Sequence, residues 1–175
     1  MGTWFSWNTV GAAALIVATV AGPAYAGTGS GTLKTTVLGA VAMVNATPLD
    51  FGGIIPAAGG TVTVNAQTGN RTSTGVVLAG GTVSHARFVA TGTPNRVVSL
   101  SLNPSPIVIV NGANSMSVNQ LRVSINGGGP QPLGPNANLG PLGVINYAIG
   151  GRLTVASNQA DGLYTGTFTL TMDYQ

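Results

Sequence analysis

The sequence predicts an all-β fold in which antiparallel sheets pack face to face as a sandwich. After residue 31 no segment has apolar side chains at helical spacing. Instead, apolar and polar residues alternate in short runs separated by Gly, Pro and Asn, which is typical of strands joined by turns. Glycine supplies 27 and proline 10 of the 175 residues, so turns are frequent.

The N-terminus has the features of a cleaved secretion signal. The run Val10 to Ala21 is small or apolar, and it is followed by Gly22-Pro23 and by the small-x-small sequence Ala24-Tyr25-Ala26. An apolar run of this length is too short to span a bilayer, which needs about 20 residues. The positive charge that usually begins such a signal is missing. We therefore expect residues 1–26 to be removed during export.

The remaining residues 27–175 have the length of a single domain with its own core. We expect them to begin with a flexible leader, residues 27–34, which contains the sequence GTGSG. The strands predicted from alternation are, in order, 35–45, 60–65, 75–79, 85–91, 96–102, 107–110, 115–125, 144–149, 152–157 and 163–174.

The last predicted strand has the clearest alternation, with apolar side chains on one face and mostly threonine on the other. Its inward face would comprise Tyr164, Gly166, Phe168, Leu170, Met172 and Tyr174. In contrast, the segment 126–141 is too rich in Gly and Pro to be a strand, and we expect it to form an exposed loop.

Composition argues against several classes of function. The chain has no cysteine, so its stability must come from burial and backbone pairing. Charged residues make up only 5% of the chain, and the six basic residues are scattered singly although the net charge is +3. A nucleic-acid-binding surface would need these residues to be clustered, so we expect no nucleic acid partner.

Groups that could carry catalysis are scarce. His85 is the only histidine, and Asp50, Asp161 and Asp173 are the only carboxylate side chains. A hydrolytic triad would have to combine His85 with one of these three carboxylates, and a carboxylate pair would have to come from the same three. No His, Cys or acidic residues recur at metal-ligand spacing. We therefore predict a protein that is not an enzyme and has no cofactor or metal, with His85 at a solvated or edge position.

Several short motifs lie in the middle and at the end of the chain. They are LDFG at 49–52 with Ile55-Pro56, GTVTV at 60–64, Arg71-Thr72, Gly75-Val76, LAGGT at 78–82, ARF at 86–88, TGTPN at 91–95, MSV at 116–118, GGRLTV at 150–155, Asn158-Gln159 and GLYTGTFT at 162–169. With these motifs the chain resembles a family of exported β-proteins of Gram-negative bacteria, domain of unknown function 4402. The resemblance implies a β-sandwich but no active site, because its motifs consist of turn and core positions.

Near the C-terminus a Gly-x-Tyr turn, Gly162 to Tyr164, leads into a final alternating strand that contains Phe168 and a penultimate tyrosine, Tyr174. In these features the C-terminus also resembles those of chaperone-usher pilins and of spore-coat-U-type subunits. This resemblance implies an immunoglobulin-like sandwich with an incomplete edge, which the N-terminal extension of the next subunit fills by strand pairing. It also implies a periplasmic chaperone and an usher as partners. The implied donor segment alternates at Leu33, Val37, Gly39, Val41 and Met43. The implied assembly strand presents Tyr164, Phe168, Leu170, Met172 and Tyr174.

Three hypotheses follow. The first is a secreted, periplasmic or cell-surface structural protein, pilin-like or matrix-forming, which associates with itself through strand pairing. The second is a self-contained surface sandwich that binds a glycan or a protein through loops such as 126–141. The third is a small transmembrane β-barrel, which the low aromatic content of 6% disfavours.

Overall fold

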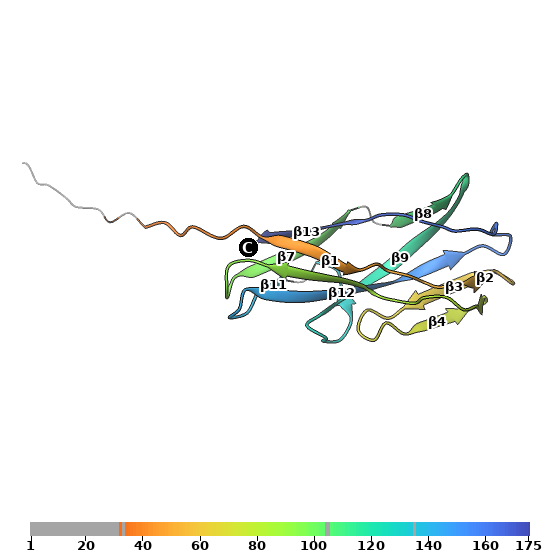
Figure 1. The fold of residues 1–175 in the computed structure, drawn as a ribbon, viewed down its shortest axis with the longest axis horizontal. Coiled ribbons are helices and arrows are strands. Elements are labelled where there is room, and N and C mark those ends of the chain that lie inside the picture. Colours follow the sequence, from red (N-terminus) through yellow and green to blue (C-terminus); the bar gives the residue numbers. More distant parts are fainter. Residues whose placement is uncertain (1–31, 33, 104–105, 135) are drawn as a thin grey trace, which may run out of the picture. The chain divides into compact units, whose positions relative to one another are not determined.

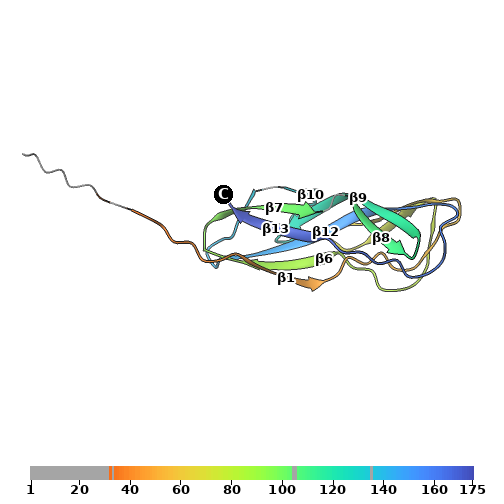
Figure 2. The same cartoon turned by 90° about the horizontal axis from the view of Figure 1, so that it is seen from above.

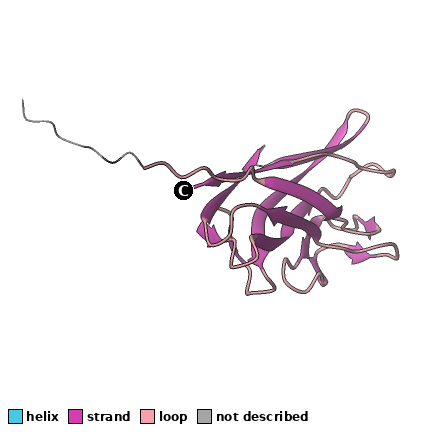
Figure 3. Cartoon of the chain, turned by 60° about the vertical axis from the view of Figure 1, so that its left-hand side comes forward, coloured by secondary structure: helices cyan, strands magenta, loops and turns pink. Residues whose placement is uncertain are grey.

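The computed structural model describes residue 32 and residues 34–103, 106–134 and 136–175. The chain divides into Met1–Thr36 and a compact unit, Val37–Gln175, which contains every described strand. The predicted signal, residues 1–26, lies outside the described residues, as does most of the predicted leader. The described residues form strands and loops without a helix, so the predicted all-β fold is confirmed (Figure 3). Consequently no described helix is long and apolar enough to cross a membrane.

The larger sheet is built around one long central strand, β12 (Val144–Val155). Along one side β12 pairs first with β6 and then with β3, and along its other side it pairs with β9. Outside these strands, β1 pairs with β6, β4 with β3, and both β8 and β10 with β9, all antiparallel (Figure 1). The bounds are β1 Ala42–Thr47, β3 Gly60–Val64, β4 Arg71–Thr74, β6 Ala86–Thr91, β8 Ile107–Asn111, β9 Asn114–Ile125 and β10 Gln131–Pro132.

The second layer is a three-stranded sheet in the order β11 (Asn136–Asn138), β7 (Val97–Asn103) and β13 (Thr169–Tyr174). Figure 2 shows β7 and β13 in one layer and β6 and β1 in the other. A small ladder of β2 (Ile54–Ile55) and β5 (Val77–Leu78) completes the fold. The predicted antiparallel sandwich is therefore confirmed.

The core lies between the two layers and is filled by alternate residues of the facing strands. Its largest fully buried side chains are Tyr147, Leu100, Leu139, Ile145, Ile149 and Leu153. The alternation predicted for the end of the chain is present in β13, where Met172 is buried and Leu170 and Tyr174 are half-buried. Burial of these apolar faces stabilises a chain that has no disulfide.

The Tyr147 hydroxyl joins the two layers because it lies 3.8 Å from the Met172 sulfur, on the opposite sheet. Burial raises the pKa of Tyr147 from 10.0 to about 12. The unfolded chain loses this proton near pH 10, whereas the folded chain keeps it. The free energy of unfolding should therefore be unaffected below pH 10 and fall as the pH rises from about 10 to about 12, by at most about 1.4 kcal/mol per pH unit.

Urea unfolding between pH 9 and 12, compared for the native chain and Tyr147→Phe, measures this contribution. The phenylalanine variant should lose less stability across that range, because it has no buried hydroxyl to ionise. Equal slopes for the two proteins would contradict the assignment.

Several predicted strand boundaries were wrong. The segments 144–149 and 152–157 were predicted as two strands, but residues 144–155 form one strand, β12, which continues through Gly150-Gly151 with a register shift against β9. Glycines inside a strand can mark a bulge as well as a turn. The predicted strand 35–45 begins later, since β1 starts at Ala42. Strand β4 was missed, because it has few apolar side chains to reveal it.

The predicted strand 163–174 is divided. Only Thr169–Tyr174 pair with β7 in β13. The preceding residues run beside β8, where Thr165 and Val110 exchange two backbone hydrogen bonds of 2.8 and 3.0 Å. The end of the chain therefore passes from the edge of the larger sheet to the smaller one.

Most described residues of the segment 126–141 are exposed, as predicted, but the segment is not a single loop. It includes β10, which pairs with β9, and β11, which pairs with β7. Within the segment, the side chain of Leu139 is fully buried in the core. Backbone pairing with existing strands compensates for the weak strand propensity of this Gly- and Pro-rich sequence.

Candidate functional site

The structure divides the predicted donor segment. Leu33 lies outside the described residues, and Val37 is 88% exposed. Gly39 is held by two hydrogen bonds: its N–H donates to the Thr93 hydroxyl at 2.7 Å, and its carbonyl accepts from the Tyr174 hydroxyl at 2.8 Å. The C-terminal half of the segment thus belongs to its own domain.

Val41 and Met43, the last two predicted donor residues, contribute to the fold of their own domain. Both side chains are half-buried against the core, and Met43 lies opposite Ala90 of β6 within strand β1. Their alternation is that of an edge strand with one face packed inward.

The predicted assembly strand contains two tyrosines that serve structural contacts. The Tyr164 hydroxyl accepts from the Gln159 amide at 2.7 Å and donates to the Ala160 carbonyl at 2.8 Å. The Tyr174 hydroxyl also accepts from the Thr93 N–H at 2.7 Å. The penultimate tyrosine therefore fastens the end of β13 to the start of the compact unit.

One edge of β13 has no backbone partner among the described residues, because its only ladder is with β7. At its end, the Gln175 N–H donates to the Val97 carbonyl at 3.0 Å. Bonded and non-bonded pairs alternate along an antiparallel ladder. It follows that the N–H and C=O groups of Leu170, Met172 and Tyr174 are directed away from β7, toward the unpaired edge.

One edge of strand β1 is also unpaired, since β6 is its only ladder partner in the described part of the chain. Figure 1 shows β1 and β13 along the same side of the compact unit, and Figure 2 places them in different layers. We call this side, bounded by β1 and β13, the open side.

Apolar side chains on the open side are only partly covered. Val41, Met43, Leu170 and Tyr174 of the two edges are half-buried against the core. Between the layers, the half-buried rings of Phe88 and Phe168 meet edge to face, with centroids 5.9 Å apart. A further strand along the open side would cover these side chains and would form backbone hydrogen bonds with the unpaired edge of β1 or β13.

The residues considered for catalysis are separated by the fold. The Asp50 carboxylate accepts from the Gly52 N–H at 2.8 Å and so stabilises a turn. Asp161 and Asp173 are exposed, and no described group of three His, Asp, Glu or Cys side chains lies together. His85 was predicted at a solvated or edge position, but it is half-buried, and its Nδ1 atom is buried without a hydrogen-bond partner among the described residues.

Arg71 organises a structural cluster that sequence reasoning missed. Its guanidinium donates to the carbonyls of Phe51 at 2.6 Å, Gly53 at 3.0 Å and Ala79 at 2.7 Å. Gly52 has φ of +66°, and a Cβ there would lie 2.5 Å from the guanidinium. One half-buried cation therefore joins two loops that are distant in sequence. The available signal was a lone arginine among small, mostly polar residues, and such a side chain needs hydrogen-bond acceptors when it is buried.

The sequence matches the family described as Domain of unknown function (DUF4402) over residues 41–174. The chain belongs to this family. The DUF4402 domain thus extends from just before β1 to the end of β13. Comparisons with curated proteins and with solved structures found no match.

The structure explains several motifs that the DUF4402 resemblance brought out. LDFG, Arg71-Thr72 and LAGGT meet in the Arg71 cluster. In GGRLTV, Gly150 lies so close to the backbone of Val64 and Ala66 that a side chain would not fit. These DUF4402 motifs therefore serve the fold, and the open side is the candidate functional site of the domain.

Proposed function

We propose that this protein is a structural subunit of a secreted or cell-surface assembly, in which copies join by β-strand pairing in the manner of pilins. The observation that carries the proposal is the open side: two unpaired strand edges, β1 and β13, flank partly covered apolar side chains. Such edges attract further strands unless something covers them.

The strand that covers the open side would come from the N-terminal segment of another copy. Leu33 and Val37 belong to an alternating sequence, which suits a strand with one apolar face. Val37 is 88% exposed within its own chain. Strand addition of this kind gains affinity from backbone hydrogen bonds and specificity from the side chains it buries.

The donor segment in this proposal is residues 27–38, which end before Gly39, whereas the segment 33–43 predicted from alternation continues to Met43. Gly39, Val41 and Met43 complete their own domain and are not free to leave it without breaking its contacts. Donation of the residues before Gly39 leaves both domains folded.

The open side also supports the involvement of assembly partners. Before a neighbouring subunit arrives, unpaired edges beside apolar side chains favour aggregation. A periplasmic chaperone that supplies a temporary strand would prevent it, and an usher would exchange that strand for the next subunit. The scattered positive charges offer no comparable surface for nucleic acid.

Electron microscopy of two purified proteins tests the proposal. A chain that begins at residue 27 should form fibres or denaturant-resistant oligomers. A chain that begins at Gly39 should remain monomeric with an unchanged β-sheet circular dichroism spectrum. Monomers in both cases, or fibres in both cases, would contradict the proposal.

A matched pair of variants tests whether β13 receives the incoming strand. Leu170→Lys places a charge among the apolar side chains of the open side, whereas Thr171→Lys places it on the exposed face. We expect the first variant to prevent assembly and the second to assemble normally. Thermal unfolding of both monomers checks that the domain is intact, and equal assembly by two folded variants would rule out this use of β13.

A further inference from the structure

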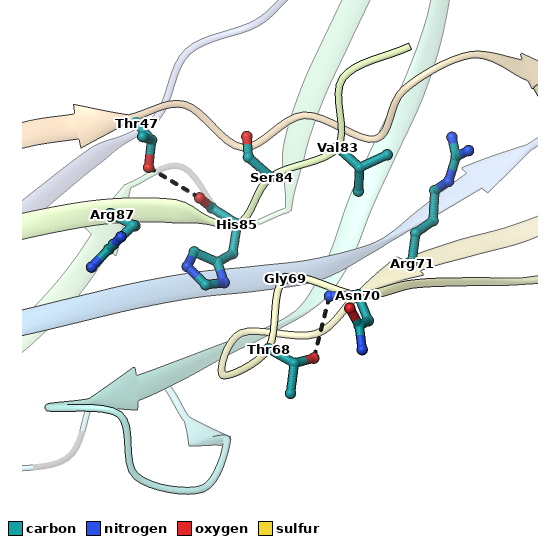
Figure 4. A pocket seen from close by; sticks show the side chains of 9 residues that line it. All are labelled: Thr47, Thr68, Gly69, Asn70, Arg71, Val83, Ser84, His85 and Arg87. Atoms are coloured by element: carbon teal, nitrogen blue, oxygen red, sulfur yellow. Dashed lines mark hydrogen bonds between the residues drawn. The ribbon is translucent and has the colours of Figure 1, made fainter. Parts of the chain in front are cut away.

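A polar pocket lies between the turn that joins β3 to β4 and the chain that enters β6. Its volume is about 530 Å³, within the range of small-ligand sites. The residues that line it are Thr47, Thr68, Gly69, Asn70, Arg71, Val83, Ser84, His85 and Arg87 (Figure 4). This lining contains two arginines and a histidine but no carboxylate.

One wall of the pocket is a turn held rigidly by its own side chains. The Asn65 carboxamide accepts from the N–H groups of Gln67 at 2.8 Å and Thr68 at 3.0 Å. The Thr68 hydroxyl accepts from the Asn70 N–H at 3.2 Å. A wall that is already ordered loses little conformational entropy when a ligand binds.

The opposite wall is formed by the chain entering β6. The Thr47 hydroxyl donates to the His85 carbonyl at 3.3 Å, and the Ser84 hydroxyl donates to the Pro48 carbonyl at 2.7 Å. Figure 4 shows the His85 ring directed toward the turn at Gly69, with Arg87 on its other side. A Cβ on Gly69 would lie 3.2 Å from His85 Nδ1, so glycine allows this approach.

Two features of the pocket go beyond what the fold requires. His85 Nδ1 is buried with no hydrogen-bond partner among the described residues, and such exceptions concentrate at functional sites. Arg87 is exposed at the pocket and has no ion-pair or hydrogen-bond partner in the described part of the chain. Its guanidinium is therefore available for a ligand.

The charge around the pocket is positive. The Arg71 guanidinium points away from the His85 ring and is used by three carbonyls, but none of these neutralises its charge. The backbone of Asp50 pairs with that of Ser84, and its carboxylate accepts from the Gly52 N–H. Asp50 does not line the pocket.

We propose that this pocket binds the anionic group of an acidic saccharide, a carboxylate or a phosphate. Arg87 would pair with the oxyanion through its planar fork of N–H donors. The hydroxyl and amide side chains of Thr68, Asn70 and Ser84 would contact sugar hydroxyls, which both donate and accept hydrogen bonds. This site is separate from the open side and does not depend on strand pairing.

Isothermal titration calorimetry of the full-length chain tests the proposal with three probes. Glucuronate carries a carboxylate, glucose 6-phosphate carries a phosphate, and glucose is the neutral control. We expect saturable binding of at least one acidic sugar and none of glucose, and the tighter acidic ligand identifies the anionic group. Absence of binding by both acidic sugars, or equal binding of glucose, would overturn the proposal.

Two variants distinguish binding in this pocket from non-specific attraction of an anionic sugar to the net positive charge of the protein. Arg87→Gln should weaken binding at least tenfold, whereas Arg122→Gln removes an exposed charge elsewhere and should leave the affinity unchanged at equal ionic strength. Because Arg87 is exposed, its variant should keep the native unfolding temperature. Equal losses in both variants, or none in Arg87→Gln, would show that the pocket is not the binding site.

Discussion

Replacement of Arg71 by methionine is expected to lower the free energy of unfolding by about 3 kcal/mol. The guanidinium makes three short hydrogen bonds to the carbonyls of Phe51, Gly53 and Ala79. Hydrogen bonds from a charged donor are among the stronger ones, and the variant leaves all three acceptors without that donor. The loop before β2 and the loop after β5 should also lose the side chain that links them by hydrogen bonds.

Urea unfolding measures this loss in the free energy of unfolding. Two further variants show whether it comes from the hydrogen bonds of Arg71. Arg71→Lys keeps the charge but has no planar fork, so it should recover only part of the stability. Arg122→Met removes an arginine that is exposed and should change stability by less than about 0.5 kcal/mol. If Arg71→Met proved as stable as Arg122→Met, the cluster would not have the structural role assigned to it.

Gly150→Ala is expected to destabilise the domain by about 3 kcal/mol or more, or to prevent its folding. Gly150 lies in the middle of β12, at the point where β12 passes the end of β3. A Cβ at this position would overlap the Val64 carbonyl and would lie 2.5 Å from the Ala66 nitrogen. Both obstacles are backbone atoms, so no change of side-chain rotamer relieves the overlap.

Gly129→Ala provides the matched control. A Cβ at Gly129 would have no neighbour within 4 Å, and this glycine does not have a positive φ. Its replacement should therefore change the unfolding midpoint very little, while Gly150→Ala should lower it strongly or yield insoluble protein. Similar midpoints for the two variants would show that β12 and the end of β3 are not as close as described.

Much of the fold could be predicted from alternation, because an edge or surface strand shows its buried face every second residue. This held for β3 and β9 and for the face of β13. It failed for β4, which is mostly exposed, and for β10 and β11, whose strand character comes from their partners. It also failed at Gly150-Gly151, where the same residue pair suits a turn or a bulge.

The candidate sites were less accessible to prediction. Alternation from Leu33 to Met43 indicated a strand, but it could not say whether the partner was the same chain or another. The structure assigns Val41 and Met43 to their own domain through the β1 ladder and the core, and Gly39 through the Tyr174 hydroxyl. No local pattern in the sequence indicates that the Tyr174 hydroxyl forms a hydrogen bond with Gly39, which lies 135 positions earlier.

By itself, the sequence determined the β class, the inward and outward faces of several strands, the shortage of catalytic groups and the motifs shared with its family. These are properties of neighbouring residues or of composition. Only the tertiary structure decided which strand edges stay unpaired, that Arg71 joins two loops, and that His85 and Arg87 share a pocket. These features depend on contacts between distant segments, and a local pattern of alternation carries no information about which strand will lie beside another.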